Sequence, residues 1–121
     1  MGKSAFEGEL DRSCYNKLYK EMQKYIEDNC DSIEFHRKSN FVREVQFASL
    51  EEMGIERVTK IQQNDDNLTF NVIVSCDIEI EETVSRNRET DGVNQWFIAS
   101  CSADFDGELK NFKVNDIGAY N

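Results

Sequence analysis

The sequence predicts an α+β fold in which N-terminal helices pack on a curved four-stranded antiparallel sheet. An early stretch has the three-and-four spacing of an amphipathic helix, a middle stretch alternates between apolar and polar residues, and a late stretch contains a hairpin signal. We therefore expect a single α+β domain over residues 1–121. Its helical part is expected at 1–54 and its sheet at 55–121.

The helical pattern is clearest between residues 9 and 29. Its apolar residues recur every three or four positions with charged residues between them: Leu10, Cys14, Tyr15, Leu18, Met22, Tyr25 and Ile26. This spacing places them on one face and predicts an amphipathic helix. Residues 31–54 are expected to form one or two short helices, although Phe41, Val45 and Phe47 also fit the alternation of a strand.

The strand pattern is most regular between residues 68 and 80, where every even position is apolar. Such alternation predicts a long strand with one buried face. The turn residues at 64–67 join it to a preceding strand at about 55–63. Asp106-Gly107 is a favoured hairpin turn between strands at 93–105 and 108–120. The charged stretch 83–92 between the two hairpins is expected to be an exposed loop.

The charge balance narrows the classes of partner. The chain has 24 acidic and 14 basic residues, for a net charge of −10, and 39% of its residues are hydrophobic. A negative surface repels phosphate backbones and anionic lipid heads, so we expect neither a nucleic acid nor a membrane as partner. Neither a signal peptide nor an apolar run of ~20 residues is evident, which favours a cytoplasmic location.

The sequence contains few cysteine and histidine residues, two types that often bind metals or cofactors. Cys14, Cys30, Cys76 and Cys101 form no Cys-x-x-Cys pair, and the sequence contains one histidine. We expect reduced, buried thiols and neither a metal nor a cofactor. Asp77, Glu79 and Glu81 lie at alternate positions, where neighbouring side chains of one face are ~7 Å apart, which indicates a solvated outer face.

A family resemblance rests on the order of the elements, on the curl expected of long strands, and on the hairpin that joins Gln95-Trp96-Phe97 to residues 106–112. In these features the chain resembles cystatin-like domains, including the nuclear transport factor two-like superfamily. This resemblance implies a ligand cavity between helix and sheet, where enzymes of the superfamily place an acid or base, and dimerisation through the sheet. Trp96-Phe97, residues 109–112 and the final Tyr120-Asn121 are also similar to accessory domains of bacterial mobile-element proteins. That similarity implies a domain taken from a longer polypeptide.

A simple register drawn from the two turns predicts which side chains line such a cavity. The predicted lining residues are Arg57, Phe70, Val74, Cys76, Gln95, Phe97, Cys101 and Asp116. Asp116 is the candidate acid or base, and Arg57 is the cation that would keep it ionised. A structural role is favoured for both, because a bulge near Gly118 would turn Asp116 outward and no His-Asp pair is present.

The same register places large apolar residues on the outer face of the sheet, where a free surface should be polar: Val58, Ile73, Trp96 and Ile98. Either a helix from residues 31–54 or another chain must cover this patch. The sequence therefore predicts a non-catalytic binding or assembly module that contacts a second copy or another protein domain. The alternatives are a small-molecule binding protein or a lyase- or isomerase-type enzyme using the cavity, and a regulator whose acidic surface blocks a basic target.

Overall fold

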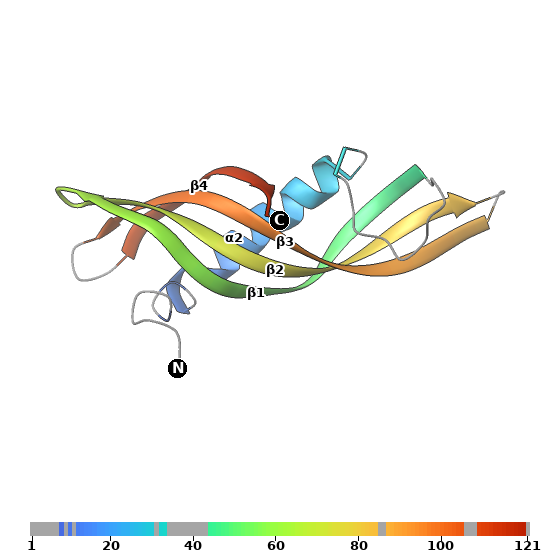
Figure 1. Cartoon of the computed structure of the whole chain (residues 1–121), viewed down its shortest axis with the longest axis horizontal. Coiled ribbons are helices and arrows are strands. Elements are labelled where there is room, and N and C mark those ends of the chain that lie inside the picture. Colours follow the sequence, from blue (N-terminus) through green and yellow to red (C-terminus); the bar gives the residue numbers. More distant parts are fainter. Residues whose placement is uncertain are drawn as a thin grey trace.

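The computed structural model describes residues 8, 10, 12–30, 32–33, 44–84, 87–105 and 109–120. Its elements follow in the order α2 (Tyr15–Asp28), β1 (Glu44–Asn64), β2 (Asn67–Val84), β3 (Asn87–Phe105) and β4 (Leu109–Ala119). Each strand pairs antiparallel with the next, so the sheet order is β1-β2-β3-β4. One helix lies obliquely across one side of a long, curved sheet, and the architecture is α+β (Figure 1).

The first three strands are longer than the sequence predicted. β1 begins at Glu44, so short helices up to residue 54 were the wrong interpretation, and the strand alternative holds from Glu44 onward; Phe41 lies outside the described residues. The loop expected at 83–92 is also wrong for the described residues, because Thr83 and Val84 pair with β3 and residues 87–92 belong to β3 itself. The charged residues 87–92 form a strand because their backbone pairs with β2, although their composition is typical of a loop. The predicted turn residues Asp106 and Gly107 lie outside the described part.

The core lies between α2 and the inner face of the sheet. The even positions of β2 from Leu68 to Ile80 are buried, as the alternation predicted. Leu18, Met22 and Ile26 form the buried face of α2 and are fully buried in the same cluster. The apolar face of the strand repeats every two residues and that of the helix about every 3.6 residues, and these two faces pack together in one core.

Two tyrosine hydroxyls tie α2 to β1. Tyr15 Oη donates to the carbonyl of Met53 at 2.6 Å, and Tyr19 Oη donates to the carbonyl of Leu50 at 2.8 Å. β1 is an edge strand, and its register shifts between Leu50 and Glu52. Carbonyls at such an edge lack a ladder partner, so the hydroxyls satisfy them and block the edge. Burial raises the pKa of Tyr19 above its usual value, which keeps this donor protonated.

Irregularities in the two outer strands set the register of the sheet. Lys60 in β1 and Asn111 in β4 both have φ of 53°, and each lies at a register shift. Each shift places one extra residue on the outer strand, so partners beyond it differ from those of a regular hairpin. At the second shift Asp104 accepts hydrogen bonds from Asn111 at 2.8 Å and Asn67 at 3.3 Å, and these bonds lower its pKa.

The simple register drawn from the turns is therefore wrong at both ends of the sheet. A regular hairpin centred on each turn would pair Val74 with Arg57 and Cys101 with Phe112. In the structure Val74 pairs with Ile55 and Cys101 pairs with Val114. The pairing of β2 with β3 has no shift, and there the alternation of the two faces is regular throughout.

Replacing Tyr15 or Tyr19 by phenylalanine tests the attachment of the helix. Each substitution leaves a β1 carbonyl without its donor and is expected to lower the free energy of unfolding by about 1 kcal/mol, measured by urea denaturation. Tyr25→Phe is the matched control, because its ring packs edge-on against Phe97 with centroids 6.1 Å apart. It should cost clearly less, and equal losses in all three variants would contradict this role of the hydroxyls.

Candidate functional site

The predicted cavity residues on β2 and β3 belong to the packed core. Phe70, Val74, Cys76, Phe97 and Cys101 are all buried in the same cluster as the apolar face of α2. Gln95 lies on the same face and is the buried polar side chain of the described residues. The apolar side chains of this group share one packed cluster with Leu18, Met22 and Ile26, and Tyr25 of α2 packs edge-on against Phe97.

Burial also decides the chemistry of the two interior thiols. It raises the pKa of both Cys76 and Cys101 to about 12, with small contributions from Asp77 and Cys14, respectively. A thiol is nucleophilic only as the thiolate, so these cysteines are inert hydrophobic groups near neutral pH. None of the described cysteines forms a disulfide.

The candidate acid and its cation do not meet in the interior. Arg57 pairs with Ile73 on the outer face of the sheet, and Asp116 pairs with Ser100 and is exposed. Both differ from the predicted positions because the register shifts in β1 and β4 move the two residues to the other face. Asp116 faces outward, as in the bulge alternative, but the shift lies between Val114 and Asp116 and not at Gly118. Asp116 borders a surface hollow of about 280 Å³ between β4 and the end of α2.

Arg57, Trp96 and Tyr120 form an ordered group on the outer face, which we call the aromatic cluster. The rings of Trp96 and Tyr120 stack with centroids 6.2 Å apart and an interplanar angle of 16°. The guanidinium carbon of Arg57 lies 5.9 Å from the centroid of the Tyr120 ring, and Nη2 donates to Tyr120 Oη at 2.5 Å. The Tyr120 amide donates to the Trp96 carbonyl at 3.0 Å, which fixes the ring at the end of β4.

This cluster explains the predicted apolar patch. Ile73 lies between Arg57 and Ile98 in register and is only 2% exposed, although it is on the outer face. Arg57 reaches Tyr120 from the opposite edge strand, so the cluster lies across this row. Trp96 remains 37% exposed. The placement of Val58 was wrong, because it pairs with Val72 and packs on the inner core.

No helix at residues 44–54 covers this patch, because these residues belong to β1. Tyr120, which the sequence reading left without a role in the patch, supplies part of the cover from within the chain. Gly118 lies opposite Ile98 and carries no side chain, so the outer face is open beside Tyr120. Tyr120 lies two positions after Gly118 and therefore on the same face of the strand. This spacing could have indicated the contact with Trp96 if the register of β4 had been known.

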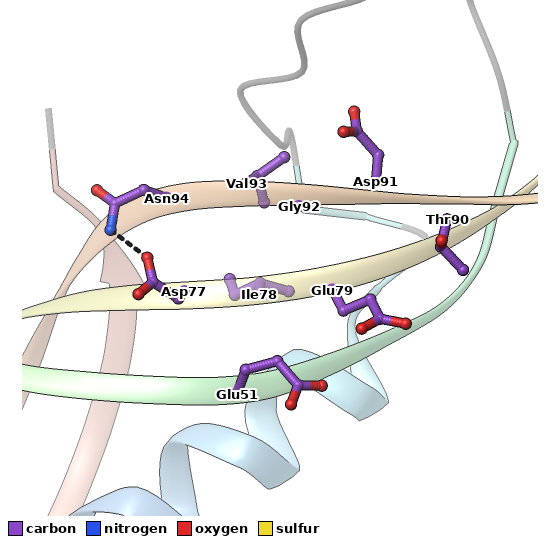
Figure 2. A pocket seen from close by; sticks show the side chains of 9 residues that line it. All are labelled: Glu51, Asp77, Ile78, Glu79, Thr90, Asp91, Gly92, Val93 and Asn94. Carbon is purple, nitrogen blue, oxygen red and sulfur yellow. Dashed lines mark hydrogen bonds between the residues drawn. The ribbon is translucent and has the colours of Figure 1, made fainter.

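An acidic groove continues the outer face next to the aromatic cluster. It has a volume of about 550 Å³ and is bordered by Glu51 of β1, residues 77–79 of β2 and residues 90–94 of β3. Figure 2 shows Glu51 and Glu79 on the same side of the strands and Asp91 pointing to the other side. Asn94 Nδ2 donates to Asp77 Oδ1 at 2.7 Å. Asp77 and Glu79 are exposed, as predicted for a solvated row.

Comparison with protein-family models, with curated proteins and with solved structures finds no match for the chain. Among the described side chains, no group of three or more His, Cys, Asp or Glu residues is placed to hold a metal ion. Likewise, no helix in the described part is both long and apolar enough to cross a membrane. The fold and surface define an acidic α+β domain with two adjoining features on its outer sheet face, the aromatic cluster and the acidic groove.

Tyr120→Ala tests the stacking in the aromatic cluster. Removing the ring uncovers Trp96 and Ile73, so the emission of the single tryptophan should shift to longer wavelength and the free energy of unfolding should fall by about 1 kcal/mol. Ile61→Ala is the control, since Ile61 is 50% exposed on β1. It should change neither quantity measurably, and an unchanged emission in Tyr120→Ala would show that the two rings do not stack.

Proposed function

We propose that the protein is a non-catalytic assembly module that makes protein contacts through the outer face of its sheet. The observation that carries this proposal is the aromatic cluster. Trp96 is held by a stacked ring and a backbone hydrogen bond, yet more than a third of its surface is exposed. A rigid, partly exposed tryptophan gives a large contact area at a low entropic cost, which is typical of the centre of a protein interface.

The proposed partner is a second copy of the chain. The ring surface of Trp96 is apolar, and a two-fold contact would place it against the same surface of the other copy. Two copies that each carry a charge of −10 repel one another, and salt screens this repulsion. Such a dimer should therefore persist or strengthen at high salt, whereas a contact made mainly by opposite charges would weaken.

The order of the elements agrees with this proposal. One helix on a four-stranded antiparallel sheet, with strands paired in chain order, is the arrangement expected from the resemblance to cystatin-like domains. The resemblance to that superfamily implies dimerisation through the sheet. A ligand carrier or enzyme has less support, because α2 packs on the predicted lining residues and Arg57 and Asp116 lie outside the core.

Light scattering over a range of protein concentrations, at low and high salt, tests the assembly. The wild type should reach the mass of a dimer and keep it at high salt. Trp96→Lys should raise the dissociation constant by ~30-fold, the equivalent of about 2 kcal/mol at the centre of an interface. The circular dichroism of this variant should stay unchanged, because Trp96 is on the surface.

Ile61→Lys is the matched control for this experiment. It makes the same kind of change at an exposed apolar residue that lies outside the aromatic cluster. Its dimer should dissociate with the wild-type constant. A monomeric wild type at every concentration and salt level would contradict the proposed assembly, and so would an equal effect of the two lysine substitutions.

A further inference from the structure

β3 extends well beyond the strand that borders it. β4 ends at Ala119, opposite Phe97, and the last contact on that side is the bond from the Tyr120 amide to the Trp96 carbonyl. β3 itself continues back to Asn87, fully paired with β2 on its other side. Figure 1 shows β4 ending midway along the sheet while β2 and β3 continue. Within the described part of the chain, no strand borders this half of β3.

The direction of the free backbone groups follows from the pairing. In an antiparallel strand the amide and carbonyl of one residue point to the same side, and successive residues point to opposite sides. The Trp96 carbonyl faces β4, and the pairing of β3 with β2 has no shift. The backbone groups of Thr90, Gly92 and Asn94 therefore point to the same side as β4, beyond its end. Their side chains share the outer face with Trp96.

The negative charges beside this edge favour a positively charged segment as its partner. The acidic groove lies along the same stretch of β3, with Glu51, Asp77 and Glu79 among its borders. A second copy of the chain would bring a like charge to this place, whereas a basic segment would find complementary charges. Gly92 leaves room at the edge, since a side chain there would meet no atom of the described residues within 4 Å.

We propose that the free edge of β3 at residues 90–94 binds an extended basic segment of another protein as an added antiparallel strand. The segment would lie in line with β4, bond to the backbone of Thr90, Gly92 and Asn94, and place alternate lysine or arginine side chains over the acidic groove. Strand addition supplies affinity through main-chain bonds, and the charges supply selectivity. This surface adjoins the dimer contact proposed at Trp96 but uses the strand edge and the acidic groove in place of the aromatic cluster.

A seven-residue peptide of alternating lysine and valine, beginning and ending with lysine and blocked at both ends, is the probe. It is titrated into the full chain and followed by amide NMR signals and hydrogen exchange. Exchange at Thr90, Gly92 and Asn94 should slow by about tenfold on saturation, because these amides gain partners. The amides of Asp91 and Val93, which face β2, should keep their rates. A peptide of alternating glutamate and valine should not bind.

Methylation of the peptide backbone separates strand addition from attraction between charges. In an antiparallel pair, residues that exchange backbone bonds carry their side chains on the same face. N-methylation of the lysines should therefore weaken binding by about tenfold or more, since each lost amide bond costs about 1 kcal/mol. N-methylation of the valines should change the affinity of the peptide by less than about threefold. If neither set of methyl groups changes the affinity, the proposed edge pairing is overturned.

Substitutions in the protein test the acidic groove. Asp77→Asn combined with Glu79→Gln should lower the affinity for the lysine peptide by about tenfold and reduce the effect of salt on that affinity. Glu21→Gln combined with Glu27→Gln is the control, because it removes the same charge from exposed positions of α2. Equal losses in the two double variants would overturn the site at β3. The peptide titration reports on this edge and light scattering on the aromatic cluster, so either proposal can fail alone.

Discussion

The unbroken pairing of β2 with β3 is the constraint on which the rest of the molecule depends. Because no bulge interrupts it from Asn67 to Val84, each residue of the two central strands has a fixed face. Leu68 to Ile80 turn every second side chain toward α2, and the positions between them form the outer face. The core, the aromatic cluster and the acidic groove are all defined relative to this pair of strands.

The two outer strands deviate from this regular pairing, and the deviations create the surface features. Register shifts in β1 place Arg57 opposite Ile73, and shifts in β4 bring Tyr120 beside Trp96. Arg57 and Tyr120 then meet over the central strands, which covers an isoleucine that would otherwise face solvent. The carbonyls of irregular β1 are satisfied from the helix by Tyr15 and Tyr19.

The sequence predicted the features that depend on local periodicity. The helix, the long central strand and its buried even positions follow from residue spacing alone, and so does the exposure of Asp77 and Glu79. The positions of Arg57, Val58 and Asp116 were wrong because they depend on bulges at residues with positive φ such as Lys60, which no turn signal marks. The paired stretch at 87–92 was missed because its charged composition is typical of a loop, whereas its β2 partner fixes it as strand.

The account depends most directly on the register that places Arg57 and Tyr120 on the outer face. Nuclear Overhauser contacts from the indole protons of the single tryptophan test it in the native protein. The structure predicts contacts from Trp96 to the Tyr120 ring, together with contacts between the side chains of Arg57 and Ile73. Contacts from Val58 to Ile73, with none between Trp96 and Tyr120, would show a regular hairpin register and would contradict the account.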